Sequence, residues 1–432
     1  MSSFVIAAPE MLAAAATDLS TIGSDLSAVH TTAAARTTGI LVAAEDEVSA
    51  AIAAVFSAHG QGFHALGAQF NAATEQFTAA LKSSASAYTG TEAQAANLLG
   101  SIFAAPAITP VPATGNPTFT GTPSLLTRLE NATLLQVVGG FFKLPVVDNQ
   151  LLTPGSPLLW LFAHTSNIPG ISLIDSDSPP KFLPLLLGET VQHTTYDGMP
   201  VVQITPAHPD GNYVVAMHGG GFLQPLLTSW IDYSMLAHQT GATIEVPMYP
   251  LLQQGGTAGV VVPKMAGLIE SEIAAHGASH VSVLGDSAGG SMALASVEYL
   301  VANNETVPAS MVLLSPVVDN SFSNPDIASI RGNWLPPAST MQQLGKEWAG
   351  NLPMNNYEVS PLYGSLKGLP PTYVYAGSQD LVAPDLLLLQ QEAVAQGAPI
   401  SFVLANGETH DWLIVTPDTL HYWPQIRQEL GA

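Results

Sequence analysis

Apolar residues in the first hundred positions recur every three or four residues, which is the spacing of an amphipathic helix. A break at residues 37–39 separates the first stripe from a second one between Val48 and Leu81. The pattern predicts an antiparallel α-helical hairpin. Because two helices alone cannot enclose a core, the stripes favour docking on a partner surface, with packing on the same chain as the alternative. The first stripe consists of Leu12, Ala15, Leu19, Ile22, Leu26 and Val29.

The use of proline changes abruptly near residue 100. Residues 1–100 hold 28 alanines and one proline, whereas residues 101–180 hold 11 prolines. Proline interrupts helices and stiffens linkers, so the change marks a domain boundary. We predict a helical hairpin over residues 1–99 and a Pro-rich linker over 100–150. A third region over 151–432 would begin with a segment that covers the next domain.

From about residue 190, short β-rich runs alternate with segments of helix length. The helical segments include 263–276 and 290–303. This alternation predicts an α/β domain with a mostly parallel sheet, whose chemistry lies beyond the carboxyl ends of the strands. The β-rich runs are 201–204, 213–217, 243–247, 281–284, 311–314, 372–375 and 400–404.

Charge narrows the range of partners. The chain has 10 Lys and Arg against 33 Asp and Glu, a net charge of -23, which argues against a nucleic-acid partner. It has no cysteine, so disulfides and thiolate chemistry are excluded. The first basic residue is Arg36, and no run of about 18 apolar residues occurs, so we expect neither a conventional signal peptide nor a transmembrane segment.

One serine stands between a predicted strand and a predicted helix. Residues 285–289 read GDSAG, which fits the G-x-S-x-G nucleophile elbow centred on Ser287. The glycines permit a sharp turn and a close approach of the following helix. The amino end of that helix favours developing negative charge.

A serine hydroxyl needs a base to take its proton and an acid to orient that base. In the elbow fold these residues follow the serine in the order acid, then histidine, each in a loop after a strand. Asp380 follows the run 372–375, and His410 follows the run 400–404. The predicted catalytic residues are therefore Ser287, Asp380 and His410.

Four other residues compete for these roles. Asp319 follows a strand that is one too early, and Asp385 falls in the next predicted helix. Asp411 adjoins His410 too closely to orient its ring, and His421 lies near the surface of the C-terminal region by our reading. We therefore retain Asp380 as the acid and His410 as the base.

A glycine run supplies candidate donors for an oxyanion. Residues 217–222 read MHGGGF directly after a predicted strand, so Gly219, Gly220 and Gly221 can point backbone N–H groups at the reacting carbonyl. The residue after the nucleophile, Ala288, would supply another donor. The alternative is a glycine-rich turn held by a structural His218, and we expect that histidine to be structural in either case.

These motifs resemble the hormone-sensitive-lipase family of α/β-hydrolases. The resemblance rests on HGGG at 218–221, GDSAGG at 285–290 and SPLY at 360–363, and covers roughly residues 190–432. It implies hydrolysis of carboxylic esters with no metal and no cofactor. The chain departs from the family pattern in two places. Asp411 and Trp412 follow the histidine where the family has a small residue and a Phe, and Leu381 directly follows Asp380.

The N-terminal segment resembles the PE domain of mycobacterial proteins. The resemblance rests on Pro9-Glu10 near the start of an alanine-rich hairpin, and on Tyr88 and Glu92, which match a Tyr-x-x-x-Asp/Glu secretion signal. It implies docking of a PPE-type helical partner and export through type VII secretion. It further implies a location at the cell surface or cell wall, with peripheral association with the envelope.

Together the two resemblances imply a secreted triacylglycerol lipase that forms an acyl-enzyme and acts on an acylglycerol ester. One alternative is a short-chain carboxylesterase. Another is a catalytically inert PE-type secretion or surface-interaction protein, against which the complete set of catalytic residues argues. Apolar residues in 134–186, with Trp334 and Trp348, form either a cover over the acyl site or part of the core.

Overall fold

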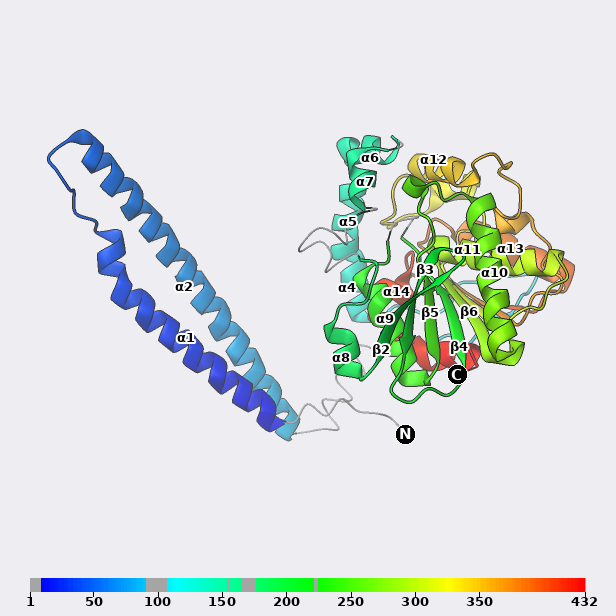
Figure 1. The fold of residues 1–432 in the computed structure, drawn as a ribbon, viewed down its shortest axis with the longest axis horizontal. Coiled ribbons are helices and arrows are strands. Elements are labelled where there is room, and N and C mark those ends of the chain that lie inside the picture. Colours follow the sequence, from blue (N-terminus) through cyan, green and yellow to red (C-terminus); the bar gives the residue numbers. More distant parts are fainter. Residues whose placement is uncertain are drawn as a thin grey trace. The chain divides into compact units, whose positions relative to one another are not determined.

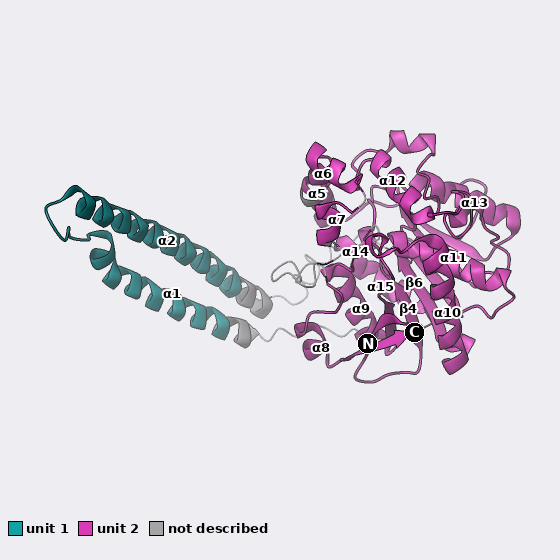
Figure 2. Cartoon of the chain, turned by 45° about the horizontal axis from the view of Figure 1, so that its top comes forward, with its two compact units in different colours: residues 1–101 teal, residues 102–432 magenta. Residues whose placement is uncertain are grey.

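The computed structural model describes residues 9–90, 107–153, 155–162, 164, 176–220 and 224–431. The chain divides into two compact units, Met1–Ser101 and Ile102–Ala432, which Figure 2 draws in different colours. Among the helices that the structure describes, none combines the length and the hydropathy that crossing a bilayer requires.

Unit 1 is a hairpin of two long helices, α1 (Pro9–Thr38) and α2 (Glu47–Gly90) (Figure 1). Small residues let the helices approach, since a Cβ at Gly67 would lie 2.3 Å from the ring of His30. The His30 ring stacks on Phe63 with 5.1 Å between ring centres. The hydroxyl of Thr37 and Nε2 of His64 are 2.7 Å apart. The expected helical hairpin is confirmed.

The hairpin leaves much of its apolar surface uncovered within unit 1. The side chains of Val29 and Phe63 are 63% and 60% exposed, and several others are similar. Tyr88, half of the expected secretion signal, lies near the end of α2, and Glu92 falls outside the described residues. The other exposed apolar side chains of α1 and α2 are Ile22, Val48, Ile52, Val55, Phe56, Leu66, Phe70 and Phe77.

Unit 2 is built on a nine-stranded sheet in the order β1-β9-β8-β7-β6-β4-β5-β3-β2. Strands β4 (Tyr213–Met217), β5 (Thr243–Pro247), β6 (Val281–Asp286), β7 (Ser310–Leu314), β8 (Thr372–Gly377) and β9 (Ile400–Ala405) run parallel. The antiparallel edge is formed by β2 (Thr190–Tyr196) and β3 (Met199–Thr205). The mostly parallel α/β-hydrolase sheet is therefore confirmed, and β2 is a strand that the sequence pattern did not reveal.

Helices cover both faces of this sheet (Figure 1). One face packs on α10 (Ala258–His276), α11 (Ser287–Ala302), α12 (Ala338–Ala349) and α13 (Ala383–Gln396), and the other on α9 (Leu227–Thr240), α14 (Trp412–Val415) and α15 (Thr419–Glu429). Alternate strand residues enter opposite layers, as Val283 and Leu284 of β6 do. Burial on both faces explains why the strands read as continuous apolar runs.

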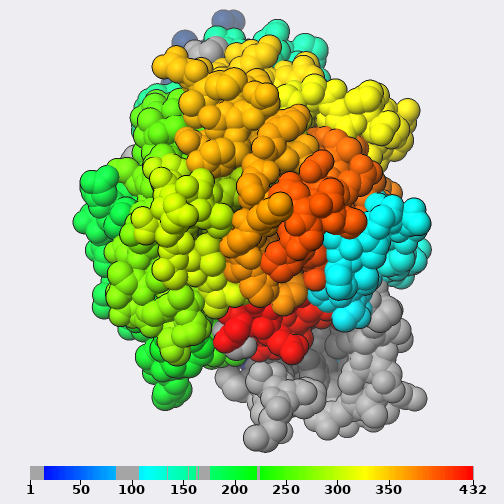
Figure 3. Space-filling view, turned by 90° about the vertical axis from the view of Figure 1, so that its right-hand side faces the viewer, coloured from blue at the N-terminus to red at the C-terminus, as the bar shows by residue number. Residues whose placement is uncertain are grey.

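The segment expected to be a linker, 100–150, belongs to unit 2 in its described part. Strand β1 (Val111–Pro112) pairs with β9, and Figure 3 shows this part of the chain against the C-terminal part. The helices α4 (Leu125–Ala132), α5 (Leu134–Phe142) and α6 (Pro145–Leu151) follow. The linker prediction was wrong for residues 107–150, because this segment contributes an edge strand that contains Pro112 and a helix that begins at Pro145. Two further short helices, α7 (Pro157–Phe162) and α8 (Phe182–Leu187), lie before β2.

Candidate active site

Ser287 begins α11 directly after the central strand β6, and its φ is 51°. A left-handed φ at a non-glycine residue is strained, so the neighbouring packing has to hold this turn in place. Gly289, two residues after the serine, makes that packing possible. A Cβ at Gly289 would lie 1.9 Å from the carbonyl oxygen of Met217 at the end of β4. The motif therefore brings the start of α11 against the loop that follows β4.

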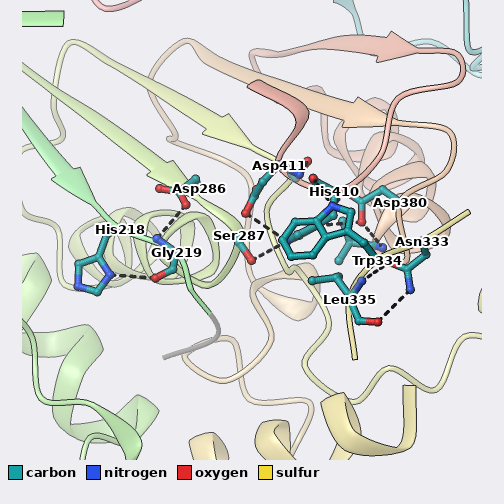
Figure 4. Close-up of polar contacts among 12 residues, drawn as sticks. His218, Gly219, Asp286, Ser287, Asn333, Trp334, Leu335, Asp380, His410 and Asp411 are labelled. Atoms are coloured by element: carbon teal, nitrogen blue, oxygen red, sulfur yellow. Dashed lines mark hydrogen bonds and ion pairs between the residues drawn. The ribbon is translucent and has the colours of Figure 1, made fainter. Parts of the chain in front are cut away.

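Three side chains from three strand ends form one hydrogen-bonded line (Figure 4). The hydroxyl oxygen of Ser287 lies 2.7 Å from Nε2 of His410. On the other side of the ring, Nδ1 lies 2.9 and 3.0 Å from the two carboxylate oxygens of Asp380. All three residues are buried, with Asp380 fully so. The structure thus brings together the three residues that the sequence nominated from separate segments.

The electrostatics of the line can stabilise a positive charge on the ring of His410. Burial lowers the pKa of His410, and the carboxylate of Asp380 beside the ring opposes this effect and raises it. Burial raises the pKa of Asp411 well above its ordinary value, and a protonated Asp411 carries no charge. Asp380 is therefore the partner that can stabilise a positive charge on His410.

The glycines of residues 219–221 differ in what their backbone N–H groups can bind. Gly219 donates its N–H to Oδ2 of Asp286 at 2.9 Å, so this amide is not free to bind an oxyanion. Gly220, at φ 97°, lines the same cavity as Ser287. Gly221 lies outside the described residues. Ala288 is buried in the first turn of α11, where backbone N–H groups lack partners inside the helix. The expectation for Gly219 was thus wrong, since a neighbouring carboxylate occupies its donor.

His218 is a buried structural residue. Its ring stacks on Tyr249 with 4.3 Å between centres, and the Tyr249 hydroxyl donates to the His218 carbonyl at 2.7 Å. Nδ1 of the ring is 2.9 Å from the carbonyl oxygen of Gly219. Burial lowers the pKa of His218 to about 4, which keeps the ring neutral. The ring therefore holds the glycine loop in place.

The competing acids are engaged elsewhere. Asp319 accepts a hydrogen bond from the Tyr363 hydroxyl at 2.8 Å. Asp385 lies in the first turn of α13 and accepts from the Asn324 amide at 2.8 Å. His421 lies in α15. Asp411 differs from these residues, because Oδ2 of its carboxyl group lies 3.4 Å from Nε2 of His410.

A cavity of about 140 Å³ opens beside Ser287 and His410. Its walls are mostly apolar, and they come from helices α5–α7, called the cover helices below, from the 334–336 loop, from α12 and from α14. Trp334 belongs to this wall, whereas Trp348 is buried in the core. Of the apolar residues that the sequence assigned either to a cover over the acyl site or to the core, some therefore line the cavity and others belong to the core. The apolar lining is Phe142, Leu151, Leu159, Leu226, Trp334, Leu335, Pro336, Met341, Leu344, Ile414 and Val415.

The cover helices α5 and α6 are attached by a few polar contacts. The Gln136 amide donates to the Gly332 carbonyl at 2.8 Å, and the Lys143 ammonium donates to the Asn333 carbonyl at 3.1 Å. The Thr340 hydroxyl donates to the carboxylate of Asp148. The cover is thus held mainly to the 332–341 segment.

The two departures from the family pattern are accommodated by packing. Trp412 is buried and meets Tyr422 edge to face, with 4.7 Å between ring centres. Leu381 is buried in the layer on the α11 side of the sheet. Neither side chain breaks the line from Asp380 to Ser287.

Two contributors to the site were missed in the sequence. Asp286, the residue before the serine, accepts from Gly219 and, at 3.4 Å, from the hydroxyl of Tyr233. Burial raises the pKa of Asp286 to about 6, against the opposing effects of the Gly219 N–H, His410 and Tyr233. Ser315 accepts the N–H of Asp411 at 3.0 Å. The position of Asp286 inside the GDSAG motif was a signal for its role, whereas nothing in the sequence singles out Ser315.

No three His, Asp or Glu side chains gather as a metal site would require in the part of the chain that is described.

Fold and site together define an α/β-hydrolase with a serine nucleophile elbow. The family described as the alpha/beta hydrolase fold matches residues 214–414, and the PE family matches residues 5–95. A triacylglycerol lipase of Mycobacterium tuberculosis is 53% identical over 314 residues, which cover 72% of this chain and 67% of the relative. An acetyl-hydrolase of Streptomyces hygroscopicus is 24% identical over 239 residues, which cover 54% and 74% of the two chains.

Solved structures agree on the fold. The crystal structure of an esterase/lipase from an uncultured bacterium superposes with a TM-score of 0.56 at 17% identity, covering 70% of this chain and 99% of that one. The chain belongs to the lipase and esterase family of α/β-hydrolases that is related to hormone-sensitive lipase, and it carries an N-terminal PE domain.

The close approach at Gly289 can be tested by adding one methyl group. We expect Gly289→Ala to destabilise the protein by about 3 kcal/mol or more, because the new Cβ overlaps the Met217 carbonyl oxygen. The main thermal transition should fall by about 5 °C or more. Gly140→Ala in α5 is the matched control, since a Cβ there meets nothing within 4 Å. Equal melting temperatures for the two variants would contradict the packing described here.

Proposed function

We propose that this chain is a triacylglycerol lipase in which Ser287 is the nucleophile, His410 the general base and Asp380 the orienting acid. The observation that carries the proposal is the line from Asp380 through His410 to Ser287 beside an apolar cavity. A catalytically inert protein of the same family would have no need to keep all three partners within hydrogen-bonding distance.

Acylation follows from this geometry. The Ser287 hydroxyl attacks the ester carbonyl and passes its proton to Nε2 of His410, which is 2.7 Å away. Asp380 stabilises the resulting imidazolium through Nδ1. When the tetrahedral intermediate collapses, the C–O bond to the alcohol breaks and the proton moves from Nε2 to the departing oxygen. A water molecule then repeats the sequence and releases the acid.

The negative oxygen of the intermediate needs donors that are already in place. We assign the N–H groups of Ala288 and Gly220 to this task, with Gly221 as a further donor from the same loop. Gly219 has a different part, because its bond to Asp286 fixes the loop behind these donors. One such donor commonly contributes about 3–4 kcal/mol to catalysis.

The cavity indicates an apolar acyl group. Its walls are apolar apart from a few polar groups near Ser287. Sites for larger ligands usually enclose about 300–1,000 Å³, so a cavity of about 140 Å³ is too small for a whole triacylglycerol. We infer that the cover helices α5–α7 move aside when such a substrate binds. The few polar contacts that hold α5 and α6 are consistent with that movement.

A short-chain carboxylesterase is the second candidate, supported by the small cavity and by the acetyl-hydrolase among the relatives. Esters of one alcohol with acyl chains of 2 to 18 carbons, together with emulsified triacylglycerol, separate the two functions. A lipase should keep its activity as the chain lengthens and should hydrolyse the emulsion. An esterase should lose activity beyond the shortest chains.

Unit 1 is proposed to serve export. Its apolar helix faces are exposed within the unit, and the PE family matches this segment. We propose that a PPE-type helical partner covers these faces and that Tyr88 and Glu92 form the signal for type VII secretion. The enzyme would then act at the cell surface or cell wall, associated peripherally with the envelope.

Ser287→Ala should abolish ester hydrolysis, because the hydroxyl is the attacking group. Loss of the nucleophile in such enzymes costs about a millionfold in kcat. Activity on a p-nitrophenyl ester, with the melting temperature as the check on folding, measures this. Activity within tenfold of the wild type would mean that another residue is the nucleophile.

Asp380→Asn should lower kcat by about four orders of magnitude, because the amide cannot stabilise the imidazolium and favours the wrong ring tautomer. Asp319→Asn is the matched control, since Asp319 is equally buried but bonds only to structural groups. Steady-state kinetics of both variants give the comparison. A larger loss for Asp319→Asn would transfer the role of orienting acid to that residue.

Removing residues 1–99 should preserve kcat per mole of folded protein, because all the proposed catalytic groups lie in unit 2. The shortened chain, and separately the variants Tyr88→Ala and Glu92→Ala, should not be exported from a mycobacterial host. Activity assays and immunoblots of culture fractions measure the two effects. A shortened chain that folds but is inactive, or that is exported normally, would contradict this division of tasks.

A further inference from the structure

Asp411 is a buried carboxyl group in the active site for which the catalytic line has no use. Both oxygens of Asp380 already face Nδ1 of His410, so the ring has its orienting acid. Asp411 lies on the opposite side, with Oδ2 3.4 Å from Nε2 and the side chain in the wall of the cavity (Figure 4). Only 7% of the residue is exposed, and Oδ1 has no hydrogen-bond partner.

The usual structural reason for an aspartate at this position does not apply. Asp411 directly precedes α14, where an aspartate normally accepts a hydrogen bond from the first turn of the helix. Here the side chain makes no such bond, and the turn is closed by the main chain, with the N–H of Ile414 donating to the Asp411 carbonyl at 2.7 Å. A buried carboxyl oxygen without a partner is costly, so the presence of this group calls for another explanation.

The backbone directs this side chain to the Nε2 side of the ring. Asp411 has a φ of 50°, a left-handed conformation that aspartate and asparagine tolerate better than most residues. Its N–H is held by the Ser315 hydroxyl at 3.0 Å. The carboxyl group is therefore fixed next to the atom that exchanges a proton with the substrate.

We propose that Asp411 is a positioning residue for the leaving alcohol, whose oxygen its carboxyl group hydrogen-bonds beside His410 Nε2. This inference rests on the proposed ester hydrolysis. An alcohol oxygen that takes the proton from Nε2 must lie within hydrogen-bonding distance of that nitrogen, and Oδ2 is 3.4 Å from the same nitrogen. The oxygen thus falls within reach of both groups.

The carboxyl group acts as a donor in this arrangement. Burial raises the pKa of Asp411 well above its ordinary value. A charge on His410 opposes this effect, whereas the charges of Asp286 and Asp380 reinforce it, and the balance keeps the group protonated. The C–O bond of the ester breaks as the proton of His410 passes to the departing oxygen. Asp411 keeps its own proton throughout and contributes only a hydrogen bond. The benefit is greatest for alcohols that leave poorly, such as glycerol.

The test compares two leaving groups on the same acyl chain in the full-length protein. p-Nitrophenyl butyrate releases a phenolate that needs no proton, whereas ethyl butyrate and tributyrin release alcohols that need one. Asp411→Leu replaces both oxygens by methyl groups and should lower kcat on the alkyl esters at least about tenfold, while kcat on the p-nitrophenyl ester changes less than about threefold. Asp411→Asn keeps a donor and tolerates the left-handed backbone, so it should stay within about threefold of wild type on all three esters.

Several outcomes would overturn the inference. Equal losses on all three esters for Asp411→Leu, or unchanged kinetics, would leave Asp411 without a role toward the leaving group. Asp411→Asn falling as far as Asp411→Leu on the alkyl esters would exclude the hydrogen-bond donor. If Asp411→Leu fails to fold, Asp411→Ala gives the same comparison. Failure of the proposed function looks different, because the wild-type protein would then hydrolyse none of the three esters.

Discussion

The close approach between the first turn of α11 and the end of β4 is the constraint on which the site depends. Because β4 and β6 are parallel neighbours, their carboxyl ends meet at one edge of the sheet. The turn after β6 can reach the loop after β4 only if residue 289 has no side chain. That contact holds Ser287 in its left-handed conformation and sets its hydroxyl against His410. The strain at Ser287 is thus supported by the packing of Gly289, two residues further along the chain.

Carboxyl groups crowd this site, and their partners distinguish them. Asp380 is paired with the ring of His410, and Asp286 accepts the Gly219 amide and the Tyr233 hydroxyl. Asp411 has no partner for one of its oxygens. In an apolar setting an unpaired carboxylate is expensive, so the group with the fewest partners keeps its proton. The two aspartates beside His410 therefore have different environments, because Asp380 pairs with Nδ1 of the ring whereas burial favours the neutral form of Asp411.

The cover helices lie over the cavity beside Ser287 in which we propose that the substrate binds. Helix α5 has one face toward the cavity, through Phe142, and an exposed apolar face that includes Val137 and Phe141. A helix that is apolar on both faces can bury one apolar face or the other, so little free energy favours a single position. This property is consistent with the proposal that the helix moves aside for an apolar substrate. Unit 1 has exposed apolar helix faces of its own, and a different family, the PE family, matches it. The partner proposed for unit 1 is therefore independent of the substrate of unit 2.

Local patterns were sufficient for much of this protein. The helix periodicity of residues 12–81, the strand runs from 213 to 404 and the glycine-flanked Ser287 are properties of short segments, and each indicated its element. The order of Ser287, Asp380 and His410 followed from strand ends, because parallel strands bring their following loops to one edge. The prolines of 107–150 led to the wrong prediction of a linker, because the sequence does not distinguish a proline at the start of a helix from one in a linker. The occupied amide of Gly219, the choice of Trp334 over Trp348 for the cavity wall, and the place of Asp411 against Nε2 were decided only by the tertiary structure. These features depend on contacts between segments far apart in the chain, and such contacts leave no periodicity in the sequence.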